Sequence, residues 1–216
     1  MNTVTDKVSC DQATARPLTR RAMAKQQTRS KVMIAARGLF REKGYEGATI
    51  RDIANAAGMS TGAVFANFAD KSDLFQAITV EDVMELTVAM RGAAERGRGI
   101  EDALLKMFAA GYAYYKPQMP LARAAFAVSW SAQDGLALRD LPCMNNILEL
   151  IGEQMSLAVG RGELSQEAEV RLRSQMLYDA YLANFGQAVF NGWSLDALSA
   201  RMRDQIRILL SGARRG

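Results

Sequence analysis

The spacing of apolar residues constrains this chain more than any other feature, because it is helical along almost the whole length. From Thr28, apolar residues recur at the i, i+3, i+4 and i+7 spacing that places them on one face of an α-helix. No alternating run rich in β-branched residues, which a strand would need, occurs in the 216 residues. Short stretches with glycine or proline separate the helical segments, as between packed antiparallel helices. The sequence therefore predicts an all-α fold.

Helix boundaries follow from the capping residues and the breakers. Serine, threonine or aspartate precedes five of the predicted helices, at Thr49, Ser60, Asp70, Ser165 and Ser194, where the side chain can accept a hydrogen bond from the first turn. The predicted helices cover residues 28–43, 50–57, 61–68, 71–91, 100–116, 121–133, 141–160, 166–190 and 195–211.

The chain contains no histidine, and this absence excludes much enzyme chemistry. Ser-His-Asp and Cys-His nucleophiles and histidine-containing metal sites are ruled out, and Cys10 and Cys143 are too few for a four-thiolate site. We therefore expect a protein that is not an enzyme and that holds no metal and no cofactor. No apolar run is long enough to span a membrane, and the polar first 25 residues do not resemble a secretory signal, so we expect a cytoplasmic protein.

Positive charge is concentrated in the first third of the chain. Residues 1–71 carry 12 Lys and Arg against 6 Asp and Glu, whereas the remainder carries 15 against 17. This asymmetry indicates an anionic partner for the first third, either nucleic acid or an anionic membrane surface. Residues 1–27 lack periodicity and are predicted to form a flexible basic arm. A basic tail beside a solvated helix face would explain residues 16–31, but not the segment that follows.

That segment, residues 49–68, reads TIRDIANAAGMSTGAVFANF and predicts a helix-turn-helix. Ala54 is small where two helices must approach closely, and Gly58 can adopt the positive φ of a tight turn between them. The second helix then exposes small residues, which suits insertion into the major groove of DNA. The alternative is an ordinary helical hairpin inside an all-helical core. The apolar residues predicted for the buried underside are Ile50, Ile53, Ala57, Met59, Val64 and Phe68.

This part of the sequence resembles the TetR family of bacterial transcriptional regulators. The resemblance covers residues 28–78 and rests on AARGLFREKGYEGATI, IANAAGMSTGAVFANF and DKSDLFQAI. It implies a three-helix DNA-binding head at residues 28–73 and a helical effector-binding and dimerisation body at residues 74–216. It also implies a homodimer, a double-stranded DNA operator and a small-molecule effector as partners.

The resemblance also implies roles for individual residues of the head. Thr49 and Lys71 are expected to bind backbone phosphates, and the recognition helix from Ser60 onward is expected to contact base edges. Basic residues of the arm, Arg20, Arg21 and Lys25, are expected to reach phosphates or a minor groove. The full set of expected DNA contacts is Arg29, Thr49, Arg51, Ser60, Thr61, Gly62, Ala63, Phe65, Ala66, Asn67 and Lys71.

Two positions depart from the family pattern. Where the family commonly has tyrosine and histidine in a YxHF core, this chain has Phe65 and Asn67. Phe65 lacks the hydroxyl that would donate to a phosphate, but it can pack against a sugar or a thymine methyl group. Asn67 can donate to a phosphate or read adenine.

The body is expected to sense a lipophilic or aromatic small molecule, because its middle helices are rich in aromatic residues and methionine. The same residues could equally form ordinary core, Arg123 could be a surface residue, and nothing near Cys143 indicates a redox sensor. The candidate effector residues are Phe108, Tyr112, Tyr115, Arg123, Phe126, Trp130 and Met144. The candidate dimer residues, on residues 166–190 and 195–211, are Met176, Ala180, Ala183, Gly186, Met202 and Ile206, unless they too are core within one chain.

We therefore expect a repressor that binds a palindromic operator and is released when an effector tilts the fourth helix and changes the separation of the heads. Activation of transcription is the alternative within this class. A body that engages a protein partner is a second alternative, and a helical enzyme without histidine is a remote third.

Overall fold

The structure, a computed structural model, describes residues 19–130, 143 and 145–213, and for residues 127–130 it describes the backbone only. The described residues form helices without any strand, so the predicted all-α fold is confirmed for them. The elements are α1 (Arg20–Gly47), α2 (Ile50–Ala56), α3 (Thr61–Phe65), α4 (Lys71–Ala94), α5 (Ile100–Tyr115), the 3-10 helix η1 (Lys116–Gln118), α6 (Met119–Trp130), α7 (Asn145–Gly160), α8 (Val170–Asn191) and α9 (Leu195–Ser211). Among these residues no helix has the length and apolar character to cross a membrane.

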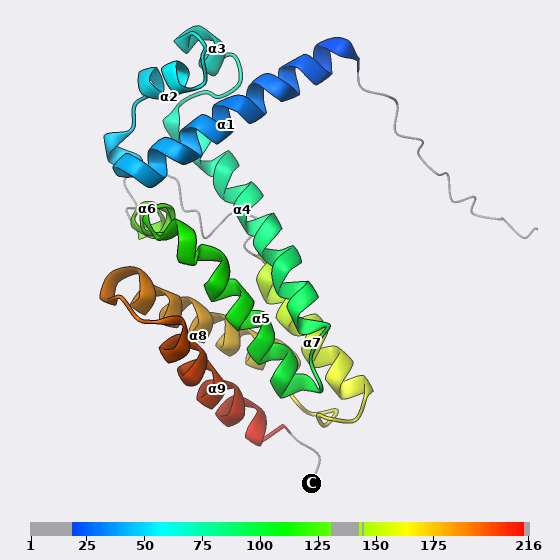
Figure 1. Cartoon of the computed structure of the whole chain (residues 1–216). Helices are drawn as coiled ribbons and strands as arrows, with labels where there is room; N and C mark the ends of the chain where they lie inside the picture. Colours follow the sequence, from blue (N-terminus) through cyan, green and yellow to red (C-terminus); the bar gives the residue numbers. More distant parts are fainter. Residues whose placement is uncertain (1–18, 131–142, 144, 214–216) are drawn as a thin grey trace, which may run out of the picture.

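The helices form a small head and a larger body joined by one long helix (Figure 1). Helices α1, α2 and α3 gather at one end of the molecule and make up the head. Helix α4 leaves the head and runs along the body, where α5, α7, α8 and α9 pack beside one another (Figure 1). Helix α6 lies at the junction, where it packs against both α1 and α8.

Four of the predicted capping residues begin helices as expected. The side chains of Thr49, Ser60, Asp70 and Ser194 each accept a hydrogen bond from the backbone N–H three residues further on, at 3.1, 3.2, 2.8 and 3.2 Å. Each bond satisfies an amide that the helix itself leaves without a partner. The starts of α2, α3, α4 and α9 are therefore encoded locally.

The prediction that Ser165 caps a helix is wrong. Helix α8 begins only at Val170, after Glu169 with a φ of 47°. The Ser165 amide donates to the Ala213 carbonyl oxygen at 2.7 Å, and its hydroxyl oxygen accepts from Glu167. This segment is held as a turn against the end of the chain, and the buried Ala168 fixes it there.

The predicted flexible arm is also wrong for the part that the structure describes. Helix α1 begins at Arg20 rather than near Thr28, and Thr19 caps it by accepting from the Ala22 amide at 3.2 Å. Residues 20–27 consist mainly of strong helix formers, so they extend the helix although they bury almost nothing. Residues 1–18 lie outside the described residues. At its other end α1 is interrupted at Gly44, whose φ of 73° fits the predicted stop.

Two apolar cores support the two parts of the molecule. The core of the body draws on α4, α5, α7, α8 and α9. The core of the head is built around Phe40 of α1, Ile53 of α2 and Val64 of α3, each with no exposed surface. It also contains Leu121 and Ala124 from α6, so a helix of the body closes the underside of the head.

A buried ion pair fixes α1 to α4 beneath the head. One Nη of Arg37 lies 2.8 Å from Oδ1 of Asp82, whose side chain is 5% exposed, and 3.4 Å from a carboxylate oxygen of Glu81. Nearby, a guanidinium Nη of Arg41 donates to the Gln118 amide oxygen at 2.6 Å. Burial raises the pKa of Asp82 to about 6, although the Arg37 charge opposes the shift. The orientation of the head therefore depends on a carboxylate that titrates near neutral pH.

The raised pKa of Asp82 predicts how stability depends on pH. A carboxyl group with a pKa of about 6 when folded and 3.8 when unfolded binds its proton more tightly in the folded state. Its contribution to the free energy of unfolding therefore falls as the pH rises from about 4 to about 6, by roughly 3 kcal/mol. Asp82→Asn removes this contribution, so the variant should gain stability relative to the wild type over that range. Chemical unfolding at pH 4, 5, 6 and 7 measures the difference.

The matched control is Glu81→Gln on the same helix, where the side chain is 51% exposed. Glu81→Gln should leave the pH profile close to that of the wild type. Parallel profiles for the wild type and Asp82→Asn would contradict the assignment.

Candidate nucleic-acid interface

Helices α2 and α3 form a helix-turn-helix through a short glycine turn. Gly58 has a φ of 67°, which favours glycine, so the positive φ predicted there is confirmed. The Met59 amide donates to the Ala54 carbonyl oxygen at 2.9 Å and closes the turn. Val64 and Phe68 anchor α3 in the core of the head, with at most 1% of each residue exposed. Only one side of α3 is therefore buried.

The opposite side of α3 faces outward and carries short side chains. Ser60, Thr61, Gly62 and Ala66 are exposed, and Ala63 is half-buried. Phe65 is the one large side chain on this surface of the described head, and it is 54% exposed. A slim exposed helix of this kind can enter a groove that a bulkier helix would not fit.

Asn67 and Arg29 close the end of α3 instead of extending outward. The Asn67 side-chain amide donates to the Ala63 carbonyl oxygen at 2.9 Å, and its Oδ1 is buried without a hydrogen-bond donor. Arg29 donates to the Asn67 carbonyl oxygen at 3.0 Å, and its guanidinium lies 4.2 Å from the centre of the Phe68 ring. Both residues thus have structural contacts, and their DNA contacts stay predictions.

Thr49 and Lys71, the two expected phosphate ligands, also have partners within the head. The Thr49 hydroxyl donates to the Asp52 carboxylate at 2.8 Å, and this hydrogen bond is the main cause that lowers the pKa of Asp52. Nζ of Lys71 donates to the Tyr45 carbonyl oxygen at 2.9 Å and lies 4.2 Å from the centre of the Tyr45 ring. An ammonium group has three N–H donors, so Lys71 keeps donors for an anion.

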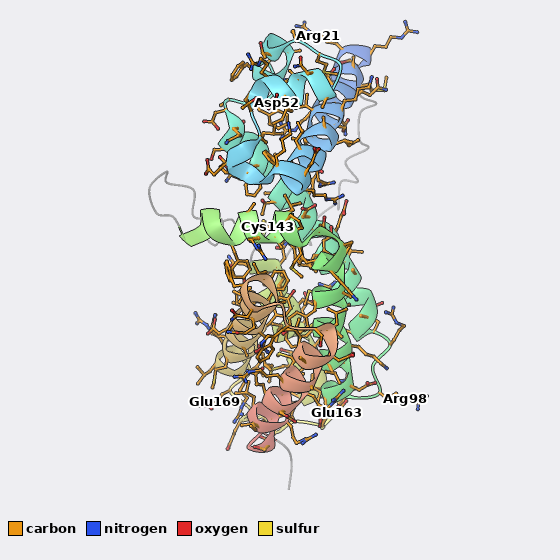
Figure 2. The ribbon with its side chains drawn as sticks, turned by 60° about the vertical axis from the view of Figure 1, so that its left-hand side comes forward. Arg21, Asp52, Arg98, Cys143, Glu163 and Glu169 are labelled. Atoms are coloured by element: carbon orange, nitrogen blue, oxygen red, sulfur yellow. The ribbon has the colours of Figure 1, made fainter. Side chains whose placement is uncertain are left out.

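Exposed basic residues also lie on the other two helices of the head. Arg51 at the start of α2 is exposed, and so are Arg20, Arg21 and Lys25 in the first two turns of α1. Figure 2 shows Arg21 and Asp52 on the head, at the end of the molecule away from Arg98 and Glu163. The described part of the basic segment, residues 19–71, therefore forms one end of the molecule (Figure 1).

Comparison with known proteins assigns this segment. Residues 33–78 match the family described as "Bacterial regulatory proteins, tetR family". The predicted resemblance to the TetR family is therefore confirmed for residues 33–78. The HTH-type transcriptional repressor AcnR of Corynebacterium efficiens is 43% identical over 75 residues, which are 34% of this chain and 40% of that repressor. The match thus spans less than half the length of this relative.

Solved structures match most of the fold of this chain. A TetR-family regulator from Mesorhizobium loti superposes with a TM-score of 0.73 at 18% identity, covering 92% of this chain and 100% of that one. The regulator FadR from Bacillus subtilis, solved in complex with stearoyl-CoA, superposes with a TM-score of 0.68 at 19% identity and covers 86% and 99%. At these identities the likeness concerns the fold, a helix-turn-helix head on a helical body.

In the body, two of the candidate effector residues are core residues. Phe108 and Tyr112 of α5 are at most 1% exposed, and both rings stack on Tyr181 of α8 at centroid distances of 5.3 and 4.9 Å. Tyr115 and Phe126 are half-buried. Their role toward an effector stays a prediction, alongside the core role that the sequence left open.

Of the other candidate effector residues, only Arg123 has a side chain that the structure describes. Arg123 is exposed and donates to the Val189 carbonyl oxygen at 2.8 Å, which ties α6 to α8. The Trp130 side chain and Met144 lie outside the described residues. A groove of about 880 Å³ opens elsewhere, between α7 and α8, and none of the candidates lines it.

A buried polar cluster that the sequence did not predict lies between α5, α8 and α9. The hydroxyl of Tyr181 is buried without a hydrogen-bond partner, and burial raises its pKa well above the usual value. One turn further along α8, the Asn184 amide donates to the Gln205 side-chain oxygen at 2.6 Å and to the Tyr112 hydroxyl oxygen at 3.4 Å. In the sequence, this cluster is indicated by a tyrosine and an asparagine that stand three residues apart on the inner face of α8, Tyr181 and Asn184.

For two of the candidate dimer residues, the predicted place at a dimer interface is wrong. Met202 and Ile206 have no exposed surface, because the apolar stripe of α9 packs against α5 and α8 of the same chain. Met176 is 45% exposed, Ala183 is exposed, and Ala180 and Gly186 are half-buried. The exposed large apolar side chains on α8 and α9 are Leu172, Met176, Leu182, Phe190 and Ile208.

Proposed function

We propose that this chain is a transcriptional repressor that binds an operator in double-stranded DNA through α3. The observation that carries the proposal is the exposed face of α3, held outward by the Gly58 turn on a basic head. The positive charge of residues 1–71 suits the phosphate backbone, which supplies much of the affinity of such proteins. The similarity to the repressor AcnR over 75 residues favours repression over activation.

We further propose that the chain divides at residue 73 into a DNA-binding head and a body that forms a homodimer and binds an effector. The exposed apolar side chains of α8, from Leu172 to Phe190, favour a dimer contact along this helix. Two heads related by a two-fold axis would suit a palindromic operator. Such a regulator works without a cofactor or catalysis, in the cytoplasm where its operator is found.

The effector in this proposal is a small lipophilic or aromatic molecule bound within the body. The aromatic content of α5, α6 and α8 supports it, as does the fold shared with FadR, which was solved with stearoyl-CoA. Binding would tilt α4 and separate the heads from the operator. The effector must bind the detached conformation better than the DNA-bound one, since only that difference shifts the equilibrium.

Selection from a random duplex pool tests the DNA proposal directly. The full-length protein should enrich a palindromic sequence and bind it far more tightly than an unrelated duplex of equal length. Enrichment of no sequence would overturn the proposal. Stearoyl-CoA, tested as a probe, should lower the affinity for the selected operator and raise the melting temperature; a body that binds a protein partner would show neither effect.

Lys71→Ala tests the phosphate role of Lys71. The affinity should fall by a similar factor on operator and unrelated DNA, and the slope of log K against log salt concentration should decrease by about one. A purely structural role, through the Tyr45 contact, would lower the melting temperature and leave the salt slope unchanged. Arg203→Ala, at an exposed position of α9 in the body, is the charge-matched control and should change neither quantity.

A further inference from the structure

The outer face of α3 has little capacity for hydrogen bonding to bases. Gly62, Ala63 and Ala66 offer no polar side-chain atom, and the Ser60 oxygen already accepts from the Ala63 amide at 3.2 Å. The Asn67 amide, which could have read adenine, donates to the backbone of α3. On the outer face of α3, only the Thr61 hydroxyl makes no hydrogen bond to any residue that the structure describes. Apart from these two hydroxyl groups, α3 can discriminate between bases only by contacts other than side-chain hydrogen bonds.

Phe65 is the side chain of α3 that suits an apolar contact. It stands one turn after Thr61, so the two side chains share one row of the helix surface, with Ala66 beside them. The Phe65 ring is 54% exposed to water although it is wholly apolar. In the major groove, the apolar group that bases present is the C5 methyl group of thymine. The exposed basic residues of α1 and α2 in the same head favour DNA over an apolar protein surface as the occupant of this face.

We propose that Phe65 determines specificity by packing its ring on thymine methyl groups in each half-site, with the Ala66 and Thr61 methyl groups beside it. This inference rests on the proposed DNA-binding function and specifies the kind of contact by which α3 distinguishes one base from another. Apolar contact, more than hydrogen bonding to base edges, then carries the sequence preference of α3. The half-site under α3 should accordingly contain thymines whose methyl groups are needed for binding.

Replacing thymine by uracil in the selected operator tests this, because it removes only the methyl group. Buried apolar carbon contributes about 0.8 kcal/mol per group, so each thymine under Phe65 that is changed to uracil should weaken wild-type binding about fourfold. Uracil at thymines in the flanking duplex should have no effect. Phe65→Ala should weaken binding to the thymine operator and abolish its sensitivity to uracil, whereas Phe65→Leu should keep part of that sensitivity.

The outcomes separate this inference from the proposed function. Failure to select any operator would overturn both. Specific binding that is the same for thymine and uracil at every position would overturn the inference and leave the repressor proposal intact. If Phe65→Ala lost the same factor of affinity for the thymine operator and the uracil operator, the ring would pack on sugar. That result would also overturn the inference. The exposure of Phe65 means that these variants should fold, and equal melting temperatures would verify this.

Discussion

Arg37→Met should destabilise the protein by about 3 kcal/mol at pH 8, because it leaves an ionised carboxylate buried without its partner. Asp82 lies 2.8 Å from the Arg37 guanidinium and is 4% exposed, so water cannot replace the lost charge. The loss should shrink at pH 5, where Asp82 with its pKa of about 6 takes up a proton. Urea unfolding at both pH values measures the two free energies.

A double substitution provides the control. Arg37→Met combined with Asp82→Leu removes both charges, and replacing a buried ion pair by apolar residues is often neutral or stabilising. The double variant should therefore be more stable than Arg37→Met alone. If Arg37→Met lowered stability by under about 1 kcal/mol, the pair would behave like a surface ion pair.

Gly97→Ala should be the second strongly destabilising change. Gly97 lies in the turn between α4 and α5, where an added Cβ would approach the backbone nitrogen and the Cβ of Ala103 to 2.6 Å. Backbone atoms at the start of a helix cannot rotate away as a side chain can, so α4 and α5 would have to separate. Overpacking of this kind costs about 1–3 kcal/mol, and contact with backbone favours the upper end.

Gly38→Ala is the matched control for this substitution. Gly38 lies within α1, and an added Cβ would meet nothing within 4 Å. Alanine there should stabilise the helix by roughly 0.5–1 kcal/mol, since it restricts the unfolded chain more than glycine does. The melting temperature should therefore fall for Gly97→Ala and rise for Gly38→Ala. A stable Gly97→Ala protein would contradict the close approach of α4 and α5.

Local signals made much of the fold predictable. Helix α9 runs over the predicted residues 195–211 because Ser194 caps it and Gly212 follows it. The start of α8 was not predictable from Ser165, since the turn there depends on a hydrogen bond to Ala213, far along the chain. The first two turns of α1 carry no apolar stripe, so a prediction based on periodicity could not find them.

The candidate DNA interface was predictable in outline and less so in detail. The Gly58 turn and the short side chains of α3 follow from the residues themselves. The inward turn of Asn67 and the contact of Lys71 with Tyr45 depend on tertiary packing. The apolar stripe of α9 was visible in the sequence, but periodicity cannot tell whether the same chain or a second copy covers it, and Met202 was therefore misassigned.

The core beneath the recognition helix crosses the proposed boundary at residue 73. Leu74 and Phe75 of α4 and Leu121 of α6 belong to it and are at most 3% exposed. A fragment cut after residue 73 would lose these side chains and leave Phe40 facing water. The excised segment should thus not be an autonomous folding unit, and any molecule that loosens α6 within the full chain also loosens the support on which α1 to α3 rest.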